Sequence, residues 1–140
     1  MILSIDPGED TGWAQSLHGR IVACGLNRPP FTRGTDRVVI EQPEYRPHSR
    51  VDPNGLITLA IRVGRAAERA VIIGVDLVDL VKPSTWKGSV PKPIHNARVR
   101  AALDPAEQAI LAACKCPAGK LNNVIDAIGL NLWALGRKVQ

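Results

Sequence analysis

Two short apolar runs, each ending in an acidic residue, constrain the fold of this chain more than any other feature. Ile2–Asp6 is followed by the turn signal Pro7-Gly8, and residues 38–41 read Val-Val-Ile-Glu. Apolar runs of this length, bounded by turn residues, predict buried strands. A buried carboxylate without a partner costs several kcal/mol, so Asp6 and Glu41 each need a cation, a hydrogen-bond donor or a metal.

The remaining pattern predicts an α/β fold, with a five-stranded mixed sheet flanked by helices. Asp104 is expected to cap the second-last helix, with Pro105 and Glu107 in its first turn. The three Trp residues are expected to pack in the core. The other predicted strands are 11–17, 20–25 and 77–81, and the predicted helices are 56–73, 94–103, 105–113 and 122–137.

The length of 140 residues suits one compact domain over 1–140, and 45% hydrophobic residues make global disorder unexpected. The first ten residues lack the basic start and long apolar run of a signal peptide. No apolar stretch is long enough to span a bilayer, and three Cys do not form a disulfide framework. We therefore expect an intracellular (cytoplasmic) protein with no membrane partner.

The charge pattern points to an anionic partner. The net charge is +5, and 12 of the 18 cations are Arg, whose planar fork suits phosphate. Between Leu80 and Leu103 there is no acid, which is typical of a phosphate-contacting segment, although a solvated helix face gives the same pattern. The cations of this stretch are Lys82, Lys87, Lys92, Arg98 and Arg100.

The loop after Glu41 carries the only Tyr of the chain, Tyr45, beside Arg46 and Arg50. An exposed ring flanked by Arg suits stacking on a nucleic-acid base. A ring packed beneath the loop fits the sequence equally well. The loop is therefore a candidate DNA contact, with its aromatic residue open to two interpretations.

A third acid, Asp126, falls in the first turns of the predicted last helix. Oxygen-only ligands suit Mg²⁺ or Mn²⁺, and two such ions about 4 Å apart can activate water in phosphodiester hydrolysis. Each acid also has an ordinary structural explanation. Asp6 could cap its turn, Glu41 could pair with an Arg, and Asp126 could complement a helix N-terminus.

Four motifs, taken in chain order, resemble the RuvC-type Holliday-junction resolvases of the RNase H-like superfamily. They span residues 1 to 136 and so cover nearly the whole chain. They are Ile2-Leu-Ser-Ile-Asp6-Pro-Gly8 with Thr11-Gly12-Trp13-Ala14, Val38-Val-Ile-Glu41-Gln42, Val81-Lys82 with Trp86-Lys87-Gly88-x-x-Pro91-Lys92, and Asn123-Val-Ile-Asp126-Ala127.

The resemblance implies an RNase H-like fold and a homodimeric endonuclease that nicks four-way junctions or other branched DNA with two Mg²⁺ or Mn²⁺ ions. The small size is compatible with a phage-type or stand-alone relative. The helix over 56–73, with small residues at Ala60, Gly64, Ala67 and Ala70, is expected at the dimer interface. The resemblance implies four metal ligands: Asp6, Glu41, Asn123 and Asp126. It implies the same four as catalytic residues, together with Lys82 and Lys92. The implied DNA contacts are Tyr45, Arg46, Arg50, Lys82, Lys87, Lys92 and Arg98.

Asn123 departs from the family pattern, which places an acid or a His three residues before the last Asp. An amide oxygen can ligate Mg²⁺ but adds no charge, so weaker metal binding is expected. Asn122, at i, i+4 from Asp126, is a competing ligand, whereas Glu9 and Asp10 are expected to be turn residues. Two alternatives remain open: an RNase H-like nuclease acting on RNA or an RNA/DNA hybrid, and a catalytically weak junction-binding protein.

Overall fold

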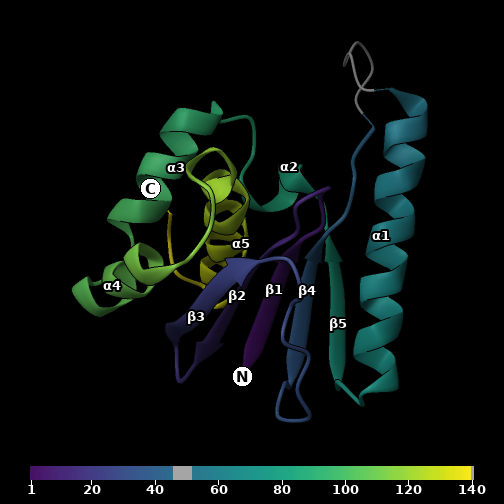
Figure 1. Ribbon diagram of the computed structural model, residues 1–140, viewed down its shortest axis with the longest axis horizontal. Helices are drawn as coiled ribbons and strands as arrows, with labels where there is room; N and C mark the ends of the chain where they lie inside the picture. The colour runs from purple at the N-terminus through teal and green to yellow at the C-terminus, as the bar shows by residue number, and fades with distance from the viewer. Residues whose placement is uncertain (46–51, 140) are drawn as a thin grey trace.

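The structure, a computed structural model, describes residues 1–45 and 52–139 of the chain. It confirms the predicted α/β fold with one five-stranded mixed sheet (Figure 1). The strand order is β3-β2-β1-β4-β5. The strands are β1 (Ile2–Asp6), β2 (Gly12–Leu17), β3 (Arg20–Leu26), β4 (Arg37–Glu41) and β5 (Leu77–Val81).

Strand direction determines which end of the sheet carries the acids. β1, β4 and β5 run parallel, and β2 and β3 form an antiparallel hairpin beside β1. The register pairs Ile5 with Ile40, which brings the next residues, Asp6 and Glu41, to the same edge. In open α/β sheets the carboxyl ends of parallel strands are where ligands bind.

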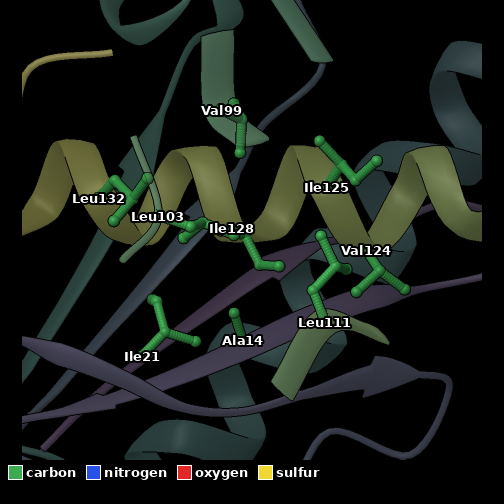
Figure 2. Close-up of a cluster of buried hydrophobic side chains, with 9 residues drawn as sticks. All are labelled: Ala14, Ile21, Val99, Leu103, Leu111, Val124, Ile125, Ile128 and Leu132. Carbon is green, nitrogen blue, oxygen red and sulfur yellow. The ribbon is translucent and has the colours of Figure 1, made fainter. Parts of the chain in front are cut away.

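Helices cover both faces of the sheet (Figure 1). α1 packs on β4 and β5 on one face, and α5 crosses β1 and β2 on the other, where α3 packs on α5 and α4 packs on β3. Figure 2 shows Val124, Ile128 and Leu132 of α5 among the buried residues of this second face. The helices are α1 (Pro53–Ile72), α2 (Pro83–Trp86), α3 (Lys92–Ala101), α4 (Pro105–Ala113) and α5 (Leu121–Ala134), with a 3₁₀ turn, η1, at Ala118–Lys120.

Helix ends differ from the expected boundaries for local reasons. α1 begins three residues earlier than expected because Asp52 accepts hydrogen bonds from the backbone N–H groups of Asn54 and Gly55. α5 ends at Ala134 rather than at residue 137, since Gly136 adopts a φ of 72° that breaks the helix. The capping box of α4, between Asp104 and Glu107, is confirmed. No helix within 1–45 and 52–139 is long and apolar enough to cross a membrane.

Buried polar contacts fix α5 against β1 and β2. Ser4 Oγ donates to the carbonyl of Ala127 at 2.7 Å, and Asn131 Nδ2 donates to Ser4 Oγ at 3.1 Å. At the start of β2, a Cβ on Gly12 would lie 1.9 Å from the carbonyl oxygen of Asn123. Only glycine permits this close approach, so the first turn of α5 is held directly against the end of the sheet.

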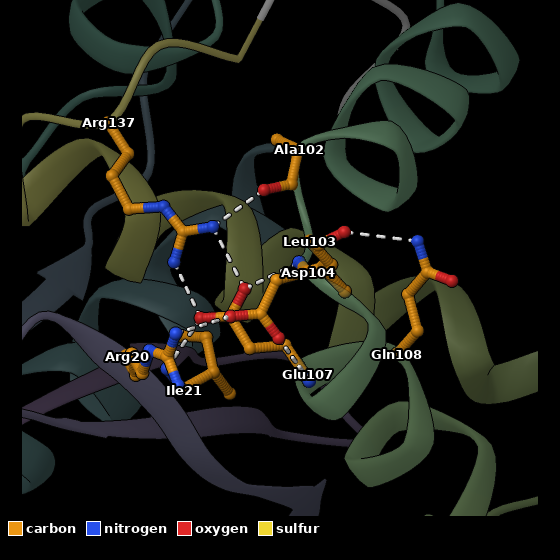
Figure 3. Close-up of polar contacts among 8 residues, drawn as sticks. All are labelled: Arg20, Ile21, Ala102, Leu103, Asp104, Glu107, Gln108 and Arg137. Atoms are coloured by element: carbon orange, nitrogen blue, oxygen red, sulfur yellow. Dashed lines mark hydrogen bonds and ion pairs between the residues drawn. The ribbon is translucent and has the colours of Figure 1, made fainter.

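A second buried polar cluster joins the C-terminal segment to α4 (Figure 3). Glu107, 1% exposed, accepts from the backbone N–H of Ile21 at 2.9 Å and from Arg137 Nη2 at 2.8 Å. Arg137 Nη2 also donates to the carbonyl of Ala102. One carboxylate therefore links β3, α4 and the residues after α5.

Candidate active site

Three carboxylates lie at the carboxyl end of the parallel strands. Asp6 ends β1 and Glu41 ends β4. Both point toward α5, because Ser4 and Val39, two residues earlier on each strand, contact that helix. Asp126 lies on α5, buried, and its charge acts on Asp6. The acids that the sequence singled out therefore face one another, although they come from three separate elements.

Lysine side chains lie beside these carboxylates. Lys87 Nζ is 3.0 Å from Glu41 Oε2, and Lys92 Nζ is 3.2 Å from Asp126 Oδ2. A cavity of about 120 Å³ lies here, lined by Lys87, Val90, Lys92, His95 and Asp126. A cavity lined by one carboxylate and two ammonium groups has the polarity needed to hold a phosphate oxygen.

Trp86 packs in the core as expected, and its indole also serves the site. Trp86 Nε1 donates to Glu41 Oε2 at 2.7 Å. Lys87 Nζ lies 4.9 Å from the centre of the same ring, a cation–π contact. The Trp86-Lys87 pair therefore fixes the Glu41 carboxylate from two sides.

The charges in this site oppose the ionisation of Asp6. Burial, followed by repulsion from Glu41 and Asp126, raises the pKa of Asp6 to about 7, and Lys87 and Lys92 offset only part of this rise. Burial lowers the pKa of Lys87, but the attraction of Glu41 and Asp126 outweighs it and raises that pKa overall. The site holds more negative charge than its two lysines neutralise, which favours the entry of a further cation.

His95 is a site residue that the sequence did not single out. Its Nε2 lies 3.5 Å from Asp126 Oδ1, and its ring meets Trp86 edge-on at 5.1 Å. Burial lowers the pKa of His95, so its imidazole is neutral at pH 7. A Cβ on Gly129 would lie 3.3 Å from His95 Nε2, so α5 needs a small residue there. The available signal was helical spacing, since His95 follows Lys92 by three residues.

The structure places Asn123 next to the turn after β1 and Asn122 against Asn96 of α3. Asn123 Nδ2 donates to the carbonyl of Asp10 at 3.1 Å, and Asn122 Oδ1 accepts from Asn96 Nδ2 at 2.7 Å. Asp10 forms an ion pair with Lys120, while Glu9 is exposed. Glu9 is thus the exposed turn residue that was expected, whereas Asp10 lies in the turn but is partly buried, and Asn123 anchors the turn through its amide nitrogen.

The predicted DNA contacts lie at the carboxylates, on the exposed surface or outside the described residues. Lys87 and Lys92 lie at the carboxylates, whereas Lys82, at the N-terminus of α2, and Arg98, on α3, are exposed. Tyr45 is 72% exposed, so its ring is not packed beneath the loop. Arg46 and Arg50 lie outside the described residues.

The donor set fits a hard divalent cation in its chemistry. Asp6, Glu41 and Asp126 supply carboxylate oxygens, and their mutual repulsion is visible in the raised pKa of Asp6. Within 1–45 and 52–139, no three His, Cys, Asp or Glu side chains form a ready-made metal cage. Lys87 and Lys92 occupy carboxylate oxygens that a metal would take. A metal would therefore bind to the remaining lone pairs of these carboxylates or compete with the lysines for their oxygens.

Comparison with known proteins adds no family assignment. No family model matches the chain, and no curated protein matches it in sequence. The function must therefore be argued from the site.

Asp6→Asn is expected to stabilise the metal-free protein at about pH 8. An Asp whose pKa is raised on folding binds its proton more tightly when folded, so stability falls as pH rises from about 4 to about 7. Removing the charge removes this loss, with a gain on the order of 4 kcal/mol for a pKa raised from 3.8 to about 7. Urea unfolding in EDTA at several pH values measures it. Asp79→Asn is the matched control, and a gain no larger than in that control would contradict the burial of charge at Asp6.

Proposed function

We propose that this chain is a metal-dependent, structure-selective DNA endonuclease with an RNase H-like fold, similar to RuvC-type resolvases, which nicks four-way junctions inside the cell. The observation that carries the proposal is the meeting of Asp6, Glu41 and Asp126 at one end of the sheet, with Lys87 and Lys92 beside them. The four motifs in order and the basic stretch before Leu103 support it.

In this proposal Asp6, Glu41 and Asp126 hold the metal, with Asn123 as a fourth, uncharged ligand if its amide rotates away from Asp10. Bound Mg²⁺ or Mn²⁺ supplies an activated water and neutralises charge on the scissile phosphate. Lys92 has a side chain that is 54% exposed, so it can leave Asp126 and donate to a phosphate oxygen. Lys82 is exposed at the N-terminus of α2 and can bind an adjacent phosphate.

The more enclosed residues orient the carboxylates. Trp86 and Lys87 fix the two oxygens of Glu41, at 2.7 Å from Trp86 Nε1 and 3.2 Å from Lys87 Nζ. His95 limits the rotation of Asp126. Because a misplacement of about 1 Å can lower a rate by about 10²-fold, these contacts matter even though their side chains need not touch the substrate.

A homodimer forms part of the proposal. α1 exposes Ile57, Ile61, Val71 and Ile72, all 52% exposed or more, on the side away from the sheet. Apolar patches of this kind mark interaction surfaces. A two-fold dimer through α1 presents two equivalent sites to the two symmetric strands of a junction.

A second candidate, a junction-binding protein without cleavage, is favoured by one observation. Lys87 and Lys92 already neutralise Glu41 and Asp126, and Asn123 uses its amide nitrogen to bind the turn after β1. A site satisfied in this way can bind DNA through its cations without taking up metal.

The deciding experiment compares four labelled substrates: an immobile four-way junction, a Y-fork, a duplex and an RNA/DNA hybrid, each with Mg²⁺, Mn²⁺ or EDTA. We expect paired symmetric nicks in the junction with either metal and none in EDTA. Cleavage of the hybrid with the junction intact would contradict the DNA assignment and favour an RNase H-like activity. Junction binding without nicks under both metals would exclude the endonuclease and leave the binding protein.

A further inference from the structure

A second basic surface lies on the opposite face of the sheet from the carboxylates. Arg62, Arg65 and Arg69 follow one flank of α1 at helical spacing. With Pro29 and Phe31 of the loop before β4, they line a hollow of about 190 Å³. We call this hollow the arginine groove. Its floor is Ile5, a residue of the core cluster on the α1 face.

The arginine groove contains cations without counter-ions. None of its three arginines forms an ion pair within 1–45 and 52–139. Arg69 instead lies over the Phe31 ring, 5.0 Å from its centre, which holds one guanidinium in place. No acidic side chain lines the hollow. Three neighbouring positive charges on a recessed surface attract an anion with several negative charges.

The dimensions suit a chain of phosphates more than a single one. Arg62 to Arg69 covers about 10 Å along the helix axis, whereas one strand of B-DNA carries a phosphate every 3.4 Å or so of its axis. Pro7 and Thr11, beside the edge of the sheet where Asp6 lies, also line the groove, which therefore reaches this edge. A nucleic-acid strand that crosses this edge of the sheet passes from the carboxylates into the arginine groove.

We propose that the arginine groove binds the phosphate backbone of a single nucleic-acid strand that flanks the branch point. A single strand can enter a hollow that has a helix on one side and a loop on the other, whereas a duplex presents its backbone on a convex surface. The contacts are to phosphates and therefore independent of base sequence. That the polyanion is a nucleic acid rests on the proposed function.

The test measures binding of a fluorescein-labelled oligo(dT) single strand of about twenty nucleotides, in EDTA so that no cleavage interferes. Each phosphate contact on a single strand contributes about 0.7 to the salt dependence of binding. Arg62→Gln with Arg65→Gln is expected to reduce the slope of log K against log salt by about 1.4, and to weaken binding about 20-fold at about 0.1 M salt. The matched control, with the same change in net charge, is Arg20→Gln with Lys115→Gln, two exposed cations outside the groove.

Each outcome decides the proposal. Equal affinity and slope in the groove variant and its control would overturn it, and so would an equal loss on a duplex of the same length. If junction cleavage is observed and oligo(dT) binding is unchanged, the groove assignment fails while the endonuclease stands. If cleavage is never observed and oligo(dT) binding still drops in the groove variant alone, the endonuclease fails while the groove assignment stands.

Discussion

Arg137→Ala is expected to lower the free energy of unfolding by about 3–5 kcal/mol, the usual cost of removing one partner of a buried ion pair. Glu107 is 1% exposed and accepts hydrogen bonds from Ile21, Asp104 and Arg137 (Figure 3). Without Arg137, a carboxylate remains buried between β3 and α4 with only backbone donors. The C-terminal segment also loses its bond to the carbonyl of Ala102.

The pH dependence gives this prediction a second readout. Burial opposes the ionisation of Glu107, but hydrogen bonds from Arg137, Ile21 and Asp104 outweigh it and lower its pKa to about 2. Because the pKa of Glu107 is lower in the folded state, its ionisation stabilises the fold at pH values above its unfolded pKa of about 4.5. This contribution is lost as the pH falls toward 2. The variant should therefore lose less stability than wild type between about pH 5 and pH 2.

Urea unfolding followed by circular dichroism measures both effects. Arg20→Ala is the matched control, because Arg20 pairs with Asp104 of the same cluster at 3.6 Å with its side chain 70% exposed. An exposed pair of this kind contributes about 0–1 kcal/mol. If Arg137→Ala lowers the free energy of unfolding no more than Arg20→Ala does, Glu107 does not depend on its buried partner.

The parts of the fold that could be predicted are those with local signals. The bounds of β1, β5 and α4 are as expected, because turn residues or caps border each one. The expected start of α1 was wrong by three residues, because the helix begins directly after its N-cap, Asp52, rather than at its first apolar residue, Leu56. The positions of Asp6 and Glu41 at strand ends could be predicted because each follows an apolar run in the sequence.

The parts that could not be predicted depend on contacts between residues distant in sequence. His95 reaches Asp126 because α3 packs on α5, and the spacing of His95 from Lys92 does not by itself reveal this contact. Lys87 pairs with Glu41 although the two residues lie on different elements and far apart in the sequence. The contact of Arg69 of α1 with Phe31 also joins residues distant in the sequence, so helical spacing alone does not reveal the hollow between α1 and this loop.

Asp126→Asn is expected to abolish junction nicking, with a loss of about 10³-fold or more, equivalent to about 4 kcal/mol of activation free energy. Asn keeps the shape of the side chain and removes its charge, which the proposed metal and Lys92 both require. The fold should survive, because the change also removes one of the repulsions that raise the pKa of Asp6. Nicking rate, junction affinity in EDTA and melting temperature are measured together.

The matched control for this change is Asp79→Asn, which removes a carboxylate paired with Arg37 at 2.7 Å, away from the three acids. We expect it to retain nicking and to lose about 1 kcal/mol of stability, as for a partly exposed pair. Loss of nicking in Asp126→Asn with junction binding retained would assign the chemistry to the carboxylates rather than to DNA affinity. Full activity in Asp126→Asn would contradict the site, since the carboxylate on α5 is the one that joins the helix to the acids of the sheet.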